Sequence, residues 1–153
     1  MLPATGGNVL VERIEGKWID AFAQVFAMCA VDTTQTAAIL SETQSRSVNV
    51  NLAELALDRL GIRPIHIILP TLRQSAPVPV RSTGASDAIA GSKAVVQALA
   101  SVDFVVDCTV EGLLHAPELP EILAGGSRIL MVSNEHPEAL ERLMPGPDLE
   151  PKV

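Results

Sequence analysis

The stretch Asp103-Phe-Val-Val-Asp-Cys-Thr-Val-Glu-Gly-Leu-Leu-His-Ala-Pro-Glu118 joins a short hydrophobic run to a polar run that contains glycine. Four residues in a row, Phe104–Asp107, are typical of a short buried strand. The polar run predicts a loop at the carboxyl end of that strand, which is where parallel-sheet domains place functional groups. His115 lies in this loop, directly before a helix that we expect to begin at Pro117.

Outward from this stretch, helical and strand patterns alternate along the chain. A helix begins near Lys17, where Trp18 and Phe22 start an apolar stripe with a spacing of three and four residues. Four further helices are expected at Asn49–Leu60, Ser86–Ala100, Pro117–Ala124 and Pro137–Leu143, and four strands at Thr36–Leu40, Pro64–Leu69, Phe104–Asp107 and Arg128–Val132.

Four strands that alternate with helices predict an α/β fold, a three-layer Rossmann-like or flavodoxin-like sandwich with a mainly parallel sheet of about four strands. Topology rules favour the strand order 2-1-3-4. The segments Ser41–Arg46 and Cys108–His115 would then face each other across a crevice at the carboxyl ends of the first and third strands.

The length of 153 residues fits one domain. We expect a leader at 1–16, an α/β domain at 17–145 and a linker or tail at 146–153. Thr71–Ala90 is a long loop that contains prolines, and it is interpreted equally well as a lid or interface segment or as a simple surface excursion.

Composition limits the classes of partner. The net charge of −7 and the pI near 4.8 argue against binding to nucleic acid or to an anionic membrane, both of which require clustered Lys and Arg. The apolar segment Ala21–Val31 is too short to span a bilayer, and the first ten residues lack a secretory pattern. We therefore expect a soluble, cytoplasmic protein that acts on a neutral or small substrate.

The familiar short motifs of nucleotide, hydrolase and zinc-protease sites are missing from the sequence, and its two cysteines form no metal-binding pattern. Cys29 is interpreted as a small core residue. Cys108 ends a strand, so both core packing and a functional role stay open.

Of the three histidines, His66 is expected to be a structural strand residue and His136 an exposed turn residue, whereas His115 is expected to be accessible in its loop.

The predicted position of His115 suggests a chemistry. A helix N-terminus disfavours positive charge, so the imidazole would be held neutral, able to take a proton from a phenolic or hydroxypyridine oxygen. The acidic residues Asp107, Glu111 and Glu118 could instead raise its basicity, and the sequence does not decide between the two. The acidic run Glu135–Glu141 is interpreted as a solvated face.

The string Leu113-Leu-His-Ala-Pro-Glu118, with Glu121–Leu130 after it, resembles the amino-terminal domain of 2,5-dihydroxypyridine 5,6-dioxygenases, enzymes of nicotinic-acid breakdown in the aminopeptidase-T-like metallopeptidase group. The resemblance covers about Trp18 to Pro145. It is supported by further matches at Val31–Thr36, Val50–Asn51, Phe104–Asp107 and Glu138–Pro145.

The resemblance implies how the site is divided. In that family an Fe(II)-dependent, extradiol-type reaction opens a hydroxylated N-heterocycle, and the iron ligands, two histidines and an aspartate, belong to a second domain that this chain lacks. It also implies that Leu114 packs on the substrate ring and that His115 binds substrate or transfers a proton. We expect this chain to bind no cofactor or metal itself, and to be inactive without the second domain.

Other interpretations stay open at this point. The chain could be the partner domain of an aminopeptidase-T-like metallopeptidase, or a stand-alone module that binds small molecules in the same crevice. The sequence leaves open whether the chain alone is an enzyme and whether it forms a homo-oligomer.

Overall fold

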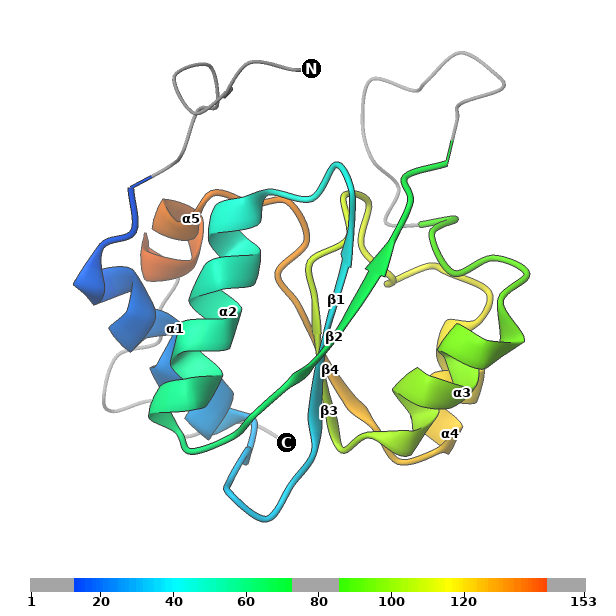
Figure 1. Ribbon diagram of the computed structural model, residues 1–153, viewed down its shortest axis with the longest axis horizontal. Helices are drawn as coiled ribbons and strands as arrows, with labels where there is room; N and C mark the ends of the chain where they lie inside the picture. The colour runs from blue at the N-terminus through cyan, green and yellow to red at the C-terminus, as the bar shows by residue number, and fades with distance from the viewer. Residues whose placement is uncertain (1–12, 73–85, 143–153) are drawn as a thin grey trace, which may run out of the picture.

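The computed structural model describes residues 13–72 and 86–142 and shows helices and strands in alternation (Figure 1). The helices are α1 (Gly16–Met28), α2 (Ser47–Arg59), α3 (Lys93–Ser101), α4 (Leu119–Ala124) and α5 (Pro137–Arg142). The strands are β1 (Ala37–Glu42), β2 (Ile65–Leu69), β3 (Phe104–Asp107) and β4 (Arg128–Met131).

The four strands form one parallel sheet in the order β2-β1-β3-β4, as the sequence predicts. β1 and β3 are the inner strands, and all of their residues are buried. In the register between them, Leu40 lies beside Asp107, so both inner strands end at the same edge of the sheet. The predicted α/β sandwich is confirmed.

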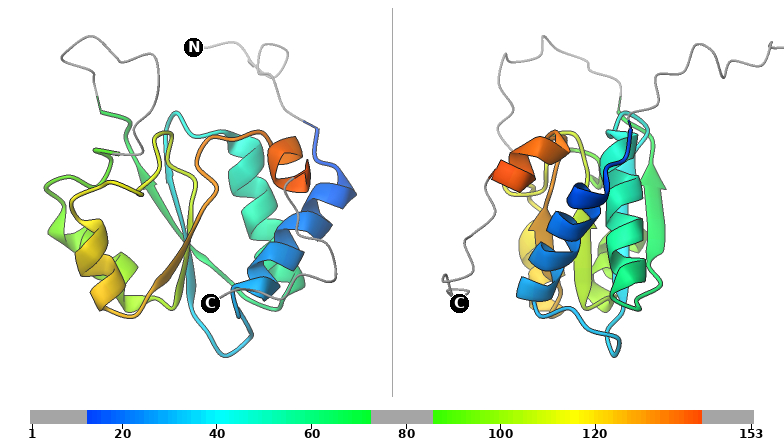
Figure 2. Two further views of the ribbon diagram at one scale, coloured as in Figure 1. Left: turned by 180° about the vertical axis from the view of Figure 1, so that it is seen from behind. Right: turned by 90° about the vertical axis from the view of Figure 1, so that its left-hand side faces the viewer.

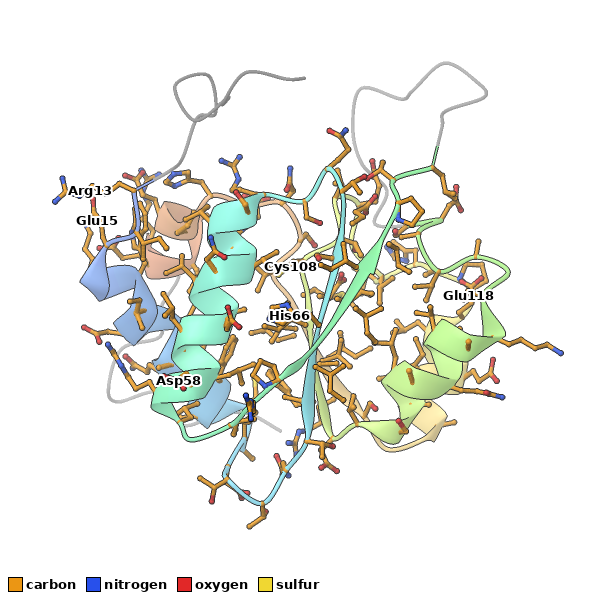
Figure 3. All side chains as sticks on the ribbon, in the orientation of Figure 1. Arg13, Glu15, Asp58, His66, Cys108 and Glu118 are labelled. Atoms are coloured by element: carbon orange, nitrogen blue, oxygen red, sulfur yellow. The ribbon has the colours of Figure 1, made fainter. Side chains whose placement is uncertain are left out.

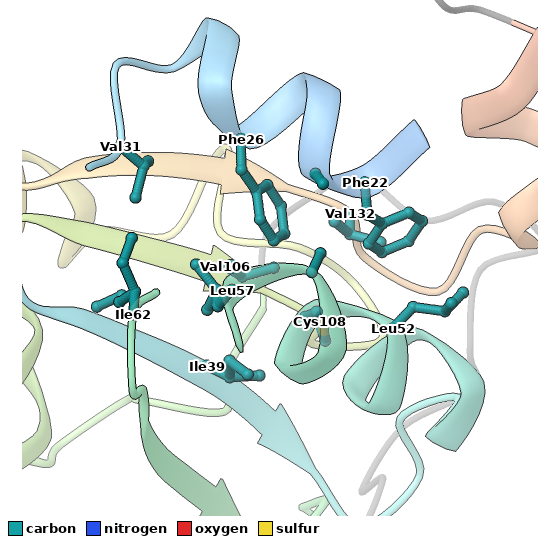
Figure 4. Packing of buried hydrophobic residues seen from close by; sticks show 14 of the residues in the cluster. Phe22, Phe26, Val31, Ile39, Leu52, Leu57, Ile62, Val106, Cys108 and Val132 are labelled. Atoms are coloured by element: carbon teal, nitrogen blue, oxygen red, sulfur yellow. The ribbon is translucent and has the colours of Figure 1, made fainter. Parts of the chain in front are cut away.

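The helices cover both faces of the sheet, with α1, α2 and α5 on one side and α3 and α4 on the other (Figures 1 and 2). On the first side, Phe22 and Phe26 of α1 point toward the sheet, where Phe26 contacts Phe104 with ring centroids 5.5 Å apart (Figure 4). A second apolar cluster, which includes Leu99 and Leu113, fills the other side. The helical stripes that the sequence shows are therefore the buried faces.

Several element boundaries differ from the sequence-based prediction, including the start of α2 at Ser47 in place of Asn49. β1 continues through Glu42, because Ser41 and Glu42 pair with the end of β2. The third helix begins at Lys93 and not at Ser86, since residues 88–91 form a hydrogen-bonded turn before it. The fourth begins at Leu119 and not at Pro117, which lies in a turn.

Several expectations fall outside what the structure describes. The leader at 1–16 lies outside it except for residues 13–16, and the tail at 146–153 does so completely. The long loop is described only at its two ends, 71–72 and 86–90. None of the described helices is long and apolar enough to cross a bilayer.

Helix α2 ends in a Schellman motif. The N–H of Gly61 donates to the carbonyl of Asp58 at 2.9 Å, and the N–H of Ile62 donates to that of Leu57 at 2.9 Å. Gly61 has φ +80°, and a Cβ there would lie 2.9 Å from Cγ2 of Thr33. Both the backbone conformation and the available space require glycine.

We therefore expect Gly61→Ala to lower the free energy of unfolding by about 1–2 kcal/mol. The matched control is Gly16→Ala at the start of α1, where nothing lies within 4 Å of the added Cβ and φ is not positive. Urea denaturation of both variants measures the difference. Equal unfolding midpoints for the two variants would contradict the assignment.

Candidate functional site

The loop after β3 is organised by the carboxylate of Asp107. Its Oδ1 accepts hydrogen bonds from the N–H and the hydroxyl of Thr109, at 3.0 and 2.6 Å, and its Oδ2 accepts one from the N–H of Leu113 at 2.8 Å. Asp107, Thr109 and Leu113 are all buried. One side chain thus fixes both the start and the far end of the segment that carries the candidate residues.

The end of β1 fixes the middle of the same loop. Oε2 of the buried Glu42 accepts from the N–H of Val110 at 2.8 Å. The hydroxyl of Ser45 donates to the carbonyl of Cys108 at 2.6 Å. The sequence predicts that the two segments face each other across a crevice. The structure brings them together at the predicted edge, where they bond directly to each other.

Leu114 and His115 occupy the two central positions of a turn that is closed by a hydrogen bond from the N–H of Ala116 to the carbonyl of Leu113, 3.0 Å long. Leu113 and Ala116 are buried, whereas Leu114 is 58% exposed and His115 is exposed. No described residue forms a hydrogen bond or an ion pair with the His115 side chain. The turn therefore presents an isobutyl group and an imidazole together, on a fixed backbone.

Gly112 lets the loop approach the end of β4 closely. It has φ +77°, and a Cβ there would lie 2.6 Å from Oγ of Ser133. Its carbonyl also accepts a hydrogen bond from the N–H of Ser86 at 3.0 Å. Contacts from two distant segments therefore add to the restraint on the turn.

The electrostatic argument that the sequence suggested for His115 is wrong in its structural premise. Helix α4 begins at Leu119, three residues separate it from His115, and it has only six residues. The dipole effect is confined to the first turn of a helix. Asp107, one of the acidic neighbours considered as an alternative, binds Thr109 and Leu113.

Burial changes the acidity of the two groups beneath the loop. It raises the pKa of Asp107 above its ordinary value even though three donors favour the charged form, and the nearby charge of Glu42 raises it further. Burial, with a contribution from Asp107, raises the pKa of the Cys108 thiol to about 12. Cys108 is completely buried in the core cluster, so core packing is its structural role (Figures 3 and 4).

The other histidines lie elsewhere. His66 is a strand residue, as predicted, and its Nε2 lies 3.2 Å from Oε1 of Glu54 on α2. The expectation that His136 is an exposed turn residue is wrong. Its ring packs edge-on against Trp18, with centroids 5.4 Å apart, and its Nδ1 accepts from the N–H of Glu138 at 3.2 Å.

A cavity of about 300 Å³ lies beside His136 and not beside His115. It is lined by Phe22, Asn49, Met131, Val132, Glu135, His136, Pro137, Ala139 and Leu140.

The sequence predicted neither this cavity nor the anchoring role of Asp107. The spacing Asp-x-Thr, which is typical of an Asx turn, is the signal that could have revealed the anchor.

Within the described residues, no three His, Cys, Asp or Glu side chains are grouped so that they could hold a metal ion. The described residues therefore do not fit the iron that the resemblance implies.

Comparison with known proteins identifies the family of the chain. The sequence model of 2,5-dihydroxypyridine 5,6-dioxygenase matches residues 17–153. The chain belongs to this family. The matched range includes Leu114 and His115.

Two relatives show how far the likeness extends. A curated 2,5-dihydroxypyridine 5,6-dioxygenase of Pseudomonas putida KT2440 is 34% identical over 134 residues, which are 86% of this chain and 37% of the relative. The solved structure of a 2,5-dihydroxypyridine dioxygenase from that organism matches with a TM-score of 0.77 at 33% identity, over 89% of this chain and 39% of the other. The chain spans less than half the length of these relatives.

The anchoring role of Asp107 predicts that Asp107→Asn destabilises the protein. An amide has only one acceptor atom, so its NH₂ group must face the N–H of either Leu113 or Thr109. We expect the free energy of unfolding to fall by about 1–3 kcal/mol. Hydrogen exchange at the Leu113 and Thr109 amides should accelerate. The exposed Asp58→Asn is the control, and an equal effect of both substitutions on the two amides would contradict the role.

The burial and raised pKa of Cys108 predict that its thiol is inert in the folded protein. At pH 8 a chromogenic disulfide reagent should modify the half-buried Cys29 first, although burial raises the pKa of that thiol as well. Cys108 should react only when denaturant is added. If Cys29→Ser retains a thiol that reacts quickly without denaturant, the assignment fails.

Proposed function

We propose that this chain forms the substrate-binding side of an Fe(II)-dependent dioxygenase that opens the ring of 2,5-dihydroxypyridine or a similar hydroxylated N-heterocycle in nicotinic-acid breakdown. The observation that carries the proposal is the turn with exposed Leu114 and His115, fixed by Asp107 at the carboxyl edge of the sheet. Membership of the family supports the class of substrate.

The side chains of Leu114 and His115 have different roles in this proposal. Leu114 supplies an apolar surface on which a flat ring packs. The neighbouring imidazole of His115 accepts a proton from a ring hydroxyl or holds that oxygen through a hydrogen bond. Because the backbone of the turn is fixed before substrate arrives, little entropy is lost in aligning these groups.

The iron belongs, in this proposal, to a carboxyl-terminal domain outside this chain. The relatives exceed this chain in length by more than a factor of two, which leaves room for such a domain. The iron would supply oxygen activation, and the described residues of this chain only bind and orient substrate or move its proton. The chain alone is then inactive, and the completed protein is expected in the cytoplasm.

The test uses a longer protein, in which this chain is followed by the proposed carboxyl-terminal domain, and supplies it with Fe(II). Oxygen-dependent loss of the ultraviolet band of 2,5-dihydroxypyridine should appear. His115→Ala should lower kcat/KM by about 100-fold or more, as expected for loss of a proton-transfer group. Leu114→Ala should chiefly raise KM. The control His66→Ala, on β2, should leave both constants unchanged.

Two results would overturn the proposal. An unchanged rate in His115→Ala would remove its assigned role. Hydrolysis of aminoacyl amides without turnover of hydroxypyridines would point to peptidase chemistry. Calorimetry of the chain alone with millimolar hydroxypyridine tests a further alternative, a stand-alone binding module. Strong binding without the missing domain would support that alternative.

A further inference from the structure

Strand β2 is an edge of the sheet, and among the described residues it pairs only with β1. The N–H of Thr43 donates to the carbonyl of Leu69 at 2.9 Å, so Leu69 directs its backbone groups toward β1. Backbone direction alternates along a strand, so Ile65 and Ile67 share this direction. The N–H and C=O groups of His66 and Ile68 therefore point outward from the sheet.

The side chains along this edge are apolar and exposed. Ile65 is 56% and Ile68 is 65% exposed, and Leu55 on α2 and Leu72 after β2 are exposed as well. These four are the majority of the seven large apolar residues that are exposed in the described part of the chain. Figure 1 looks onto this edge, where β2 crosses in front of the other strands.

Prolines flank β2 at positions 64 and 70, but other usual protections of an edge strand are missing from it. Its sequence is Ile-His-Ile-Ile-Leu, which contains no Lys, no inward charge and no internal proline. Its only ionisable side chain is that of His66, which lies at the strand (Figure 3) and is paired with Glu54. Such an edge is a template for another strand.

We propose that β2 pairs antiparallel with β2 of a second copy of this chain, about a two-fold axis at Ile67. His66 of each copy then lies opposite Ile68 of the other, and each pair exchanges two backbone hydrogen bonds. On one face Ile67 meets its own copy and Ile65 meets Leu69. The two sheets, each of four strands, become one continuous sheet.

The pattern of donors along the edge favours a second copy as the occupant. Pro64 and Pro70, which have no N–H, occupy the outward positions on either side of His66 and Ile68. The edge is therefore symmetric about Ile67. Pairing about Ile67 gives every outward N–H an acceptor within the opposite strand, and it sets the two prolines opposite each other beyond the ladder. If the two-fold axis lay at His66 or Ile68 instead, a proline would enter the ladder. Because proline has no N–H, the carbonyl of the residue opposite it would lack a donor.

Charge also favours approach along this edge. The chain carries a net charge of −7, so two copies repel each other in general. β2 holds no carboxylate, and Oε1 of the neighbouring Glu54 lies 3.2 Å from Nε2 of His66. The edge is thus a part of the surface where the repulsion is small and where apolar area is available to bury.

Sedimentation velocity of the full chain over a dilution series tests the pairing. The chain should be a dimer at high concentration. Ile68→Lys should raise the dissociation constant by about 100-fold, because each dimer carries two copies of the unfavourable substitution. The residue is exposed, so the variant should fold, which its urea midpoint checks. Leu123→Lys, an exposed site on α4, is the matched control and should dimerise as the parent does.

Hydrogen exchange identifies the surface independently. The His66 and Ile68 amides should become protected as concentration rises, whereas the Ile67 amide, which faces β1, should be protected at every concentration. A chain that stays monomeric, or a dimer that Ile68→Lys does not weaken, would overturn the proposal. A different occupant of the edge, such as an extended segment of another protein, would then be indicated. These outcomes do not depend on the function of His115.

Discussion

The structure of the candidate site depends on the buried carboxylate of Asp107. Its side chain binds Thr109 and Leu113, and its own carbonyl accepts from the N–H groups of Val132 and Ser133 at 3.0 and 2.8 Å. One residue at the end of β3 thus joins its own loop to the start of the loop after β4. Burial nevertheless raises its pKa, so the three donors do not fully replace water around the charge.

The restrained loop and the open edge follow from the same parallel sheet. Its inner strands, β1 and β3, are buried completely, so polar groups at their carboxyl ends must find partners in neighbouring loops. This requirement brings Glu42 and Asp107 into contact with one segment and leaves the turn at Leu114 and His115 free to face outward. At the edge, β2 has only one neighbouring strand in the described part of the chain, and its residues Ile65 and Ile68 are exposed.

The chain belongs to the 2,5-dihydroxypyridine 5,6-dioxygenase family, and its loop after β3 lies at the carboxyl edge of a parallel sheet. A parallel sheet offers the carboxyl ends of its strands as one surface. Because the loops on that surface are bonded to one another, the surface can keep its shape while another domain approaches it. Hydrogen bonds hold the backbone of the loop, and the side chains of Leu114 and His115 are exposed on it.

Local sequence patterns predict the strand Phe104–Asp107, the alternation of elements and the loop that carries His115, because periodicity and turn composition are local properties of the chain. Three features depend on the tertiary structure: the helix after this loop begins at Leu119, His136 packs on Trp18, and Asp107 anchors the turn. Packing across the fold and competition among buried donors decided these features. Neither is encoded in the spacing of neighbouring residues.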